Sequence, residues 1–542
     1  MSRLKTLLKR IQLGRSEWLA TLLQLPRTEA SPSTRGLVMI QIDGLSHAQI
    51  QHALERGRMP FLQKLLRRKG YRLHRQYAGM PSSTAAFQGE LFYGVKGVVP
   101  AFSFRDSDSG EMVRMFEPGA ASDVERQLEE RGGEPLLQGG SAYVDNYTGG
   151  AAEAHYCASA LGWGPGLRRA NTLVVILLFL SNIYSFIRIA VLFVVELVLA
   201  IVDFCRGLLQ GRNLVSELKF VPTRVGISIV LRELVTIGVK VDIARGLPII
   251  HLNFLGYDEQ AHRRGPKSLF AHWTLKGIDD AVGRLWRAAH RSHYRDYDVW
   301  IYSDHGQEDV ISYLRLTGRT IEEAVSSVFS DYCNRPVPLS LFAGHGVQTH
   351  RVRRLGGKRI QWLFPVKDQP SGDVTDANVA VRGLGPVGFV YCDALGEAKE
   401  RDAAALELAT KTQVPLVMVP NGPGRAIAWA GAAVYQLPEQ SADVFGAEHP
   451  FLHEVTDDLI TLCHHPSAGQ FILCGWRMGV DPCSFSNENG AHGGAAPEET
   501  SAFVLVPSTV DLYAGGSGPL RATDLRNAAL IHLGRSAGQK EE

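Results

Sequence analysis

Short apolar runs that end at an acidic residue recur along the chain, and each predicts a buried strand of a parallel sheet. Three such runs occupy residues 36–44, 247–257 and 297–302. The first ends at Asp43, the second leads into Asp258, and the third leads into Asp304 and His305. Parallel strands are buried on both faces and therefore appear as continuous apolar runs. Because ligands bind at the carboxyl ends of strands in open α/β sheets, we expect these polar residues to share one edge.

Helical patterns lie between and beside these runs, at residues 46–69, 80–94 and 269–290. The second pattern begins with Ser82, Ser83 and Thr84 and closes at Gly94. A hydroxyl here is commonly a plain N-cap, because its oxygen accepts an orphan amide of the first turn. The same position lies at the positive end of the helix dipole, which stabilises an alkoxide or a phosphate. A catalytic hydroxyl would also need a base or a metal to activate it.

The rest of the chain indicates a second, smaller region. Residues 102–140 are acidic and glycine-rich and are expected to form loops, whereas residues 387–392, 415–420 and 426–437 carry strand patterns. The expected order is a basic amphipathic segment (1–35), core (36–150), a hydrophobic helical insert (151–245), core (246–320), a smaller α+β portion (321–455), core (456–535) and a polar tail (536–542). The expected fold class is α/β.

Residues 170–204 are the most hydrophobic stretch and contain the charged residues Arg188 and Glu196. One bilayer crossing takes about 20 apolar residues, so the stretch exceeds one crossing and falls short of two crossings with a turn. A charge at mid-bilayer is costly unless it is paired or reaches the interface. We expect a membrane-embedded or interfacial helical insert; the alternative is a hydrophobic cap or oligomer interface buried in protein.

Composition excludes some functions and compartments. The 542 residues carry 57 Lys and Arg against 55 Asp and Glu, and a net charge of +2 gives no basis for nucleic-acid binding. The seven cysteines form no CxxC pair, which is typical of reduced thiols in the cytosol. Residues 1–30 mix basic residues with leucines and lack the features of a signal peptide. They predict a basic helix on an anionic membrane or an ordinary surface helix.

Acidic and imidazole side chains with metal-ligand chemistry follow these patterns. Asp258 and His262 are four residues apart and can share one face of a helical turn. His492 lies in a loop followed by two glycines. With the polar residues at the strand ends they make three carboxylates and three imidazoles, which suit two divalent ions. Two metals about 4 Å apart ionise a hydroxyl and stabilise the leaving oxygen of a phosphoryl displacement, which is the activation that Thr84 requires.

This ordered set of motifs resembles the alkaline phosphatase superfamily, and within it the type I phosphodiesterase/nucleotide pyrophosphatase branch. The motifs are Ile-Asp-Gly at Asp43, Pro-Ser-Ser-Thr at Thr84, the pair Asp258 and His262, Ser-Asp-His-Gly at Asp304 and His305, and His-Gly-Gly at His492. The resemblance spans roughly residues 36–507 and leaves residues 151–245 outside. It implies a mostly parallel central sheet flanked by helices, a two-zinc site and a covalent phospho-enzyme intermediate.

The resemblance also implies a role for each matching residue. Thr84 would be the nucleophile, since it has the family's interval to the closing glycine, Gly94. One metal would be held by Asp43, Thr84, Asp304 and His305, and the other by Asp258, His262 and His492. The first metal would lower the pKa of the Thr84 hydroxyl, and the second would bind a phosphoryl oxygen and later activate water. We expect zinc, with manganese as the alternative.

One departure from the branch concerns substrate binding. Nucleotide pyrophosphatases usually place an asparagine downstream of the nucleophile to bind a phosphoryl oxygen, and residues 102–106 contain none. Arg105 is predicted to substitute as a phosphate clamp, with a plain surface arginine as the alternative. The expected protein is a metal-dependent phosphodiesterase at a membrane, acting on a phosphate ester that is lipid-linked. A phosphomonoesterase or phosphotransferase, or a catalytically silent membrane scaffold, are the alternatives.

The order of the motifs constrains the topology of the insert. Asp43 and Thr84 precede the hydrophobic stretch, and the other expected ligands follow it. If all of them bind one metal pair, both ends of the stretch lie on one side of the membrane. A single crossing is then excluded, and a transmembrane hairpin, a re-entrant element or an in-plane helix remains. The flanking arginines predict that the active site is on the cytoplasmic side; they are Arg168, Arg169, Arg206 and Arg212.

Overall fold

The computed structural model describes residues 16–28, 31–115, 117–160, 226–333, 379–392, 398–513 and 518–535, together with isolated positions between 162 and 201. The first half of the predicted basic segment, the polar tail at 536–542 and most of the hydrophobic stretch at 170–204 lie outside the described residues. Among the residues described, no helix is both long enough and apolar enough to cross a membrane.

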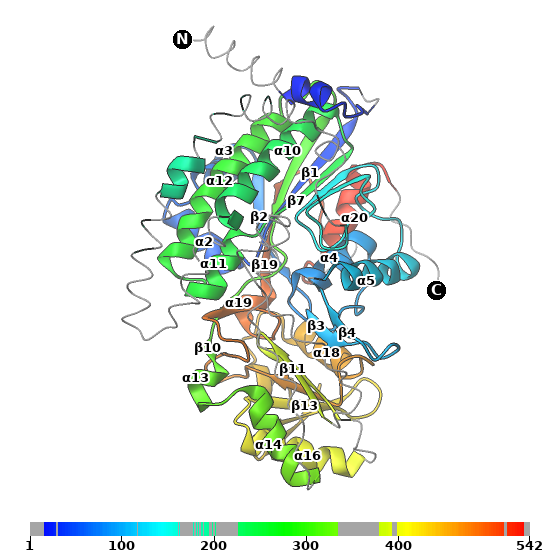
Figure 1. Cartoon of the computed structure of the whole chain (residues 1–542), viewed down its shortest axis with the longest axis vertical. Helices are drawn as coiled ribbons and strands as arrows, with labels where there is room; N and C mark the ends of the chain where they lie inside the picture. Colours follow the sequence, from blue (N-terminus) through cyan, green and yellow to red (C-terminus); the bar gives the residue numbers. More distant parts are fainter. Residues whose placement is uncertain are drawn as a thin grey trace.

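A seven-stranded sheet forms the centre of the larger part of the molecule (Figure 1). In spatial order its strands are β2 (Tyr71–Tyr77), β19 (Ser501–Pro507), β8 (Asp296–Tyr302), β1 (Arg35–Ile42), β7 (Ile249–Phe254), β5 (Ser141–Tyr143) and β6 (Glu153–His155). The five strands from β8 to β6 are parallel, and β19 is antiparallel to both of its neighbours. The predicted α/β class with a mostly parallel central sheet is confirmed.

Helices cover both faces of this sheet. Figure 1 shows α2 (His47–Glu55), α3 (Pro60–Arg68), α10 (Arg232–Arg245) and α12 (Leu269–Ala289) on one side and α4 (Thr84–Tyr93), α5 (Pro118–Arg131) and α20 (Ala522–His532) on the other. Side chains of β1 alternate between two hydrophobic cores, with Leu37 and Met39 in one and Val38 and Ile40 in the other. All four are fully buried, and each contributes about 1.5–3 kcal/mol relative to exposure.

The smaller part contains a six-stranded antiparallel sheet. Its strands, in spatial order, are β11 (Ala380–Leu384), β12 (Val387–Tyr391), β16 (Phe471–Cys474), β13 (Leu416–Pro420), β14 (Ala426–Ala430) and β15 (Ala433–Leu437). Residues of α14 (Ile321–Cys333) and α16 (Ala398–Lys411) pack in the core on one face, and those of α18 (Leu452–Cys463) in the core on the other. Because β16 belongs to this sheet, the smaller part extends beyond the predicted boundary at 455.

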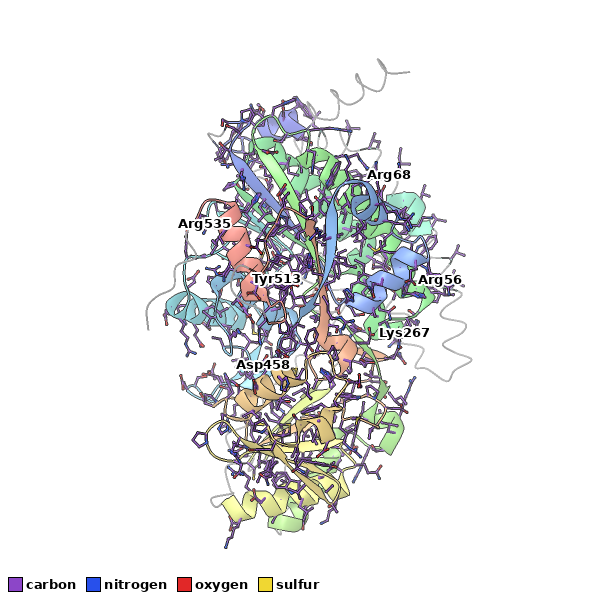
Figure 2. The ribbon with its side chains drawn as sticks, turned by 180° about the vertical axis from the view of Figure 1, so that it is seen from behind. Arg56, Arg68, Lys267, Asp458, Tyr513 and Arg535 are labelled. Atoms are coloured by element: carbon purple, nitrogen blue, oxygen red, sulfur yellow. The ribbon has the colours of Figure 1, made fainter. Side chains whose placement is uncertain are left out.

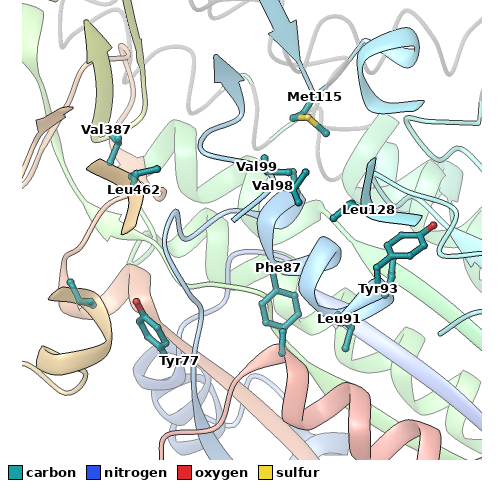
Figure 3. Close-up of a cluster of buried hydrophobic side chains, with 14 of the residues drawn as sticks. Tyr77, Phe87, Leu91, Tyr93, Val98, Val99, Met115, Leu128, Val387 and Leu462 are labelled. Atoms are coloured by element: carbon teal, nitrogen blue, oxygen red, sulfur yellow. The ribbon is translucent and has the colours of Figure 1, made fainter. Parts of the chain in front are cut away.

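Apolar packing and one partly buried acid join the two parts. Figure 3 shows Val387 and Leu462 of the smaller part in the same hydrophobic cluster as Phe87 and Leu91 of α4. Asp458, on α18, accepts hydrogen bonds from the Tyr77 hydroxyl at 3.0 Å and from Arg521 Nη2 at 2.8 Å. Figure 2 shows Asp458 at the junction between the parts.

Several predicted boundaries differ from the structure for identifiable physical reasons. The single helix expected at 46–69 is two helices, because the chain turns at Gly57 (φ +64°) and Pro60 starts α3. The expected loop at 102–140 contains α5 and the short hairpin of β3 (Ser103–Arg105) and β4 (Met112–Arg114). The predicted insert at 151–245 begins and ends within the core, since β6 extends the sheet and α10 packs against it.

Candidate metal and phosphoryl-transfer site

The carboxyl ends of three neighbouring strands bring the predicted acids together. Asp43 follows β1, Asp304 follows β8, and Asp258 lies in the first turn of α11 (Gly256–Arg264), which follows β7. Because β8, β1 and β7 are adjacent and parallel, their carboxyl ends meet at one edge of the sheet. The fold thereby brings Asp43 close to Asp258 and Asp304, which lie more than 200 positions later in the sequence.

The first group surrounds the hydroxyl of Thr84, the first residue of α4. Ser83 is the N-cap, and its side chain accepts the Ala86 amide. Thr84 Oγ1 lies 3.5 Å from Asp43 Oδ1 and 3.3 Å from His305 Nε2. His305 Nε2 is 3.3 Å from Asp304 Oδ2 as well. The helix start thus presents its hydroxyl directly to two carboxylates and an imidazole.

The second group lies beside the first and shares a histidine with it. Asp258 Oδ1 is 3.4 Å from His262 Nε2 and 3.8 Å from His492 Nε2. The rings of His305 and His492 stack with centroids 3.7 Å apart. Ligand atoms of Asp258, His305 and His492 lie within 4.8 Å of one another, as do those of Asp43, Asp304 and His305. The structure therefore brings all seven predicted ligands into two adjoining groups, with His305 common to both.

The histidines are oriented by hydrogen bonds at their other ring nitrogen. Nδ1 lies 2.8–3.0 Å from a backbone carbonyl oxygen in each case, that of Gly306 for His305, Ser82 for His492 and Gly490 for His262. A carbonyl oxygen only accepts, so Nδ1 carries a proton, and the ring nitrogen that is left to bind a metal is Nε2. All three Nε2 atoms face the carboxylates, and this is the arrangement by which histidine binds a metal.

Burial and charge show that these residues fit divalent cations. Asp43, Asp258 and Asp304 are 2%, 5% and 0% exposed. Asp304 Oδ2 accepts no hydrogen bond from the described residues, although His305 Nε2 lies 3.3 Å away, and a buried carboxylate oxygen without a hydrogen bond is costly. Three carboxylates and three imidazoles form a donor set that zinc or manganese accepts. A bound cation would supply the missing partner.

Burial and neighbouring charges shift the protonation of the second group in different directions. Burial opposes protonation of His262, but the carboxylates of Asp258 and Glu488 outweigh it and raise the pKa of His262 well above its usual value, so this ring must lose a proton when a cation binds. Burial lowers the pKa of His492 well below its usual value, and the neighbouring His305 lowers it further, so His492 is neutral. Burial opposes ionisation of Asp258, but the imidazoles of His262 and His492 outweigh it and lower the pKa of that carboxyl overall. An ionised Asp258 and a neutral His492 are both in the form that binds a cation.

Gly44 allows the two groups to approach each other. Its φ of +70° is in the left-handed region, and a Cβ at this position would lie 2.7 Å from Asp258 Oδ1. Both observations require glycine here. The Asp-Gly pair that breaks the first apolar run is therefore a structural requirement of the site.

Sequence reasoning missed three side chains that hold the predicted ligands. Asn253 Nδ2 donates to Asp43 Oδ2 at 2.7 Å, and Gln307 Nε2 donates to Asp258 Oδ1. Glu488 Oε2 lies 2.9 Å from His262 Nδ1. Asn253 could have been found, since it is a polar residue inside an apolar parallel strand. Such outer partners orient metal ligands and raise their basicity.

The structure does not place Arg105 with these groups. Arg105 ends β3, its backbone amide donates to the Tyr391 hydroxyl at 3.0 Å, and its Nε donates to the Gly110 carbonyl at 3.3 Å. The hydrogen bonds described for this side chain stabilise its own hairpin. Its role as a phosphate clamp stays a prediction.

The family comparison bears on the segment that carries four of the predicted ligands. Residues 247–330 match the family model described as type I phosphodiesterase/nucleotide pyrophosphatase. This segment is therefore similar to the family, and the match covers the second stretch of the central sheet and not the whole chain. The matched range includes Asp258, His262, Asp304 and His305.

Two solved structures are similar to this chain along most of its length. Phosphonoacetate hydrolase from Sinorhizobium meliloti, in complex with phosphonoformate, has a TM-score of 0.47 and 12% identity, covering 94% of this chain and 96% of that one. An inactive variant of murine ectonucleotide pyrophosphatase/phosphodiesterase 5, in complex with AMP, has a TM-score of 0.46 and 11% identity, covering 94% and 97%. No curated protein matches by sequence.

Proposed function

We propose that the protein is a metal-dependent phosphodiesterase in which Thr84 is the nucleophile. The observation that carries this proposal is the position of Thr84 Oγ1, 3.3 Å from His305 Nε2 and 3.5 Å from Asp43 Oδ1 at the start of a helix. Two divalent cations would be held by the two groups of ligands, with Zn²⁺ favoured over Mn²⁺ by the three imidazoles.

The geometry supports a two-step displacement on phosphorus. When bound, the cations would lower the pKa of the hydroxyl and stabilise charge on the leaving oxygen. Asp43 and His305 orient Oγ1 toward the phosphorus, and the N-terminus of α4 stabilises the phosphoryl oxygens. The bond from Thr84 Oγ1 to phosphorus forms as the bond to the leaving alkoxide breaks. Water then cleaves phospho-Thr84 and restores the hydroxyl.

Turnover of a diester in preference to a monoester is the expected result of the proposed function. Metal-replete protein should hydrolyse bis-p-nitrophenyl phosphate faster than p-nitrophenyl phosphate, with Zn²⁺ or Mn²⁺ supplied, and the release of p-nitrophenol measures both. Faster monoester turnover would instead make the protein a phosphomonoesterase, and transfer to an added alcohol would make it a phosphotransferase. No turnover of either ester would indicate a silent scaffold.

We also propose that the hydrophobic stretch holds the protein at a membrane and that the substrate is lipid-linked. Described aliphatic residues in the stretch recur every three or four positions, and each is 55–58% exposed; they are Ile187, Val191, Val194, Val198 and Ile201. Aliphatic residues at this spacing share one helical face, and such a face in water favours burial in lipid. Since residues before and after the stretch build one site, both of its ends lie on the side of that site. The basic flanks favour the cytoplasmic side.

Deletion of residues 170–204 is expected to release the protein from membranes, because it removes this aliphatic face. The measurement is co-sedimentation with vesicles of phosphatidylcholine and phosphatidylglycerol, for the full chain and the deletion. Serine at Ile187, Val191 and Val194 is the milder matched variant and should weaken sedimentation in the same direction. Unchanged sedimentation of both variants would show that another surface binds the lipid.

A further inference from the structure

A second polar layer lies directly beneath the candidate site, on the same face of the sheet. It consists of Gln41, Gln88, Asp145, His251 and Tyr302, and we refer to these five residues as the buried polar layer. None of them is more than 4% exposed. They are not among the predicted ligands, and the reaction proposed above does not use them.

Three strands that lead to the site also contribute a residue to the layer. Gln41 is two positions before Asp43 on β1, and Tyr302 is two positions before Asp304 on β8. Residues two apart in a strand point to the same face, so these side chains stand directly behind the carboxylates. On β7, His251 is likewise two positions before Asn253, whose side chain donates a hydrogen bond to Asp43.

Gln88 occupies the corresponding position on the helix that carries Thr84. The two residues are four apart on α4 and so share one helical face. Gln88 Nε2 donates to Gln41 Oε1 at 3.1 Å and to Asp145 Oδ1 at 2.9 Å. Gln88 Oε1 accepts the Asn146 amide at 2.8 Å. Three hydrogen bonds thus fix one side chain, and they tie α4 to β1 and to the loop after β5.

The remaining bonds join the layer into one network. His251 Nδ1 lies 2.8 Å from Asp145 Oδ2, and His251 Nε2 is hydrogen-bonded to the Tyr302 hydroxyl. Aromatic contacts with α4 add to it, since Phe87 stacks on Tyr302 and Phe92 meets His251 edge to face. Of the polar side-chain atoms in this layer, Gln41 Nε2 has no hydrogen-bond partner among the described residues. Apolar side chains of similar size would often be as stable in such a position, whereas directional hydrogen bonds such as the three made by Gln88 specify one arrangement.

We propose that Gln88 is a positioning residue, which sets the height and rotation of α4 so that Thr84 Oγ1 faces Asp43 and His305. This inference rests on the proposed function of Thr84. The described hydrogen bonds of the Gln88 side chain go to Gln41, Asp145 and Asn146 and not to a predicted ligand, so Gln88 acts through the helix. A small displacement of a reacting atom can cost about 100-fold in rate, so a rigid support beneath the nucleophile has a catalytic consequence.

Gln88→Met tests the proposal, because methionine keeps the approximate size and removes all three hydrogen bonds. We expect kcat for bis-p-nitrophenyl phosphate to fall by roughly 10- to 100-fold, KM to change by less than about 3-fold, and the metal content to stay unchanged. Gln41→Met removes a single acceptor of Gln88 and should give a smaller loss of kcat in the same direction. It also provides the test if Gln88→Met does not fold.

Asp279→Ala is the matched structural control. Asp279 lies on the opposite face of the sheet, where it is buried and accepts the Phe61 and Leu62 amides at 2.9 Å. Its loss should lower the Tm and leave kcat at 25 °C unchanged. If Gln88→Met keeps the wild-type kcat, or loses no more than Asp279→Ala at a similar Tm, Gln88 is only structural and the proposal is wrong.

A crystal structure of Gln88→Met separates this inference from the proposed function. We expect the separation of Thr84 Oγ1 and His305 Nε2 to lengthen from 3.3 Å. An unchanged separation would overturn the positioning role whether or not the protein turns over a phosphate ester. Absence of turnover by the wild type would instead overturn the proposed function and leave the distance to decide whether Gln88 places the hydroxyl.

Discussion

Thr84→Ala is expected to reduce phosphodiester turnover by roughly 1,000-fold or more, because it removes the oxygen that attacks phosphorus. The protein should still fold, since Thr84 follows the N-cap and Ser83 retains its bond to the Ala86 amide. Metal content should also persist, because the acids and imidazoles of both groups remain. The measurements are kcat with bis-p-nitrophenyl phosphate and the intact mass of the protein after mixing with substrate.

Two further variants test whether the loss of turnover in Thr84→Ala comes from the missing hydroxyl. Thr84→Ser retains a hydroxyl and should keep part of the activity and the mass increase of a phosphorylated chain. Ser268→Ala removes a helix N-cap hydroxyl from α12, far from the nucleophile in sequence, and should keep the wild-type kcat. Substantial turnover by Thr84→Ala, or a phosphorylated residue elsewhere, would show that the attacking oxygen has been assigned incorrectly.

Removal of metal is expected to abolish turnover and to lower the Tm. Three buried carboxylates lie together in the site, and a cation that binds only the folded chain stabilises it by about 4 kcal/mol at 1,000 times its Kd. Dialysis against a strong chelator should therefore give an inactive protein with a reduced Tm. Addition of Zn²⁺ or Mn²⁺ should restore both properties, as measured by calorimetry and by diester hydrolysis.

Two Asp→Asn variants show whether this response comes from the candidate site. Asp304→Asn should lose the increase in Tm on addition of metal, since it removes one of the three buried carboxylates that would hold the cations. Asp279→Asn leaves the site intact and should respond as the wild type does. An unchanged Tm on addition of metal, together with unchanged diester hydrolysis after chelation, would contradict the assignment of both groups as cation sites.

The sequence predicted the centre of the fold better than its edges, for a physical reason. Strands β1, β7 and β8 are buried on both faces, so their apolar runs are visible without any knowledge of their neighbours. The edge strand β2 has the sequence Tyr-Arg-Leu-His-Arg-Gln-Tyr, which carries too few apolar residues to be distinguished from a loop. β5 and β6 have three residues each. Strands this short form because they pair with neighbouring strands, and three residues are too few to show a hydrophobic pattern in the sequence.

Helix α5 shows how charge can hide an element. Its sequence is rich in Asp, Glu and Arg, and the flanking glycines suggested a loop. Ala121, Val124 and Leu128 nevertheless recur at helical spacing and are buried. Three apolar residues are enough for a helix that covers the edge of a core, but they are a weak signal beside the surrounding charges.

The candidate site was predictable as a set of residues and not as a geometry. Asp43, Asp258 and Asp304 are recognisable because each follows a buried run, and parallel strands align their carboxyl ends. No pattern indicates that His305 adjoins both groups, because this depends on the stacking of its ring on His492. The contribution of Gln88 is equally hidden, since a glutamine inside a helix is ordinary until its three partners are known.

The position of β19 has a consequence for biosynthesis. It lies between β2 and β8, and it leaves the ribosome more than 400 residues after β2. At about 5–20 residues per second, the edge of β2 waits roughly 20–80 s for β19, and the edge of β8 (Asp296–Tyr302) waits roughly 10–40 s. An unpaired edge is a template for pairing with another chain, so the strand order leaves these two edges open to such pairing until β19 is synthesised.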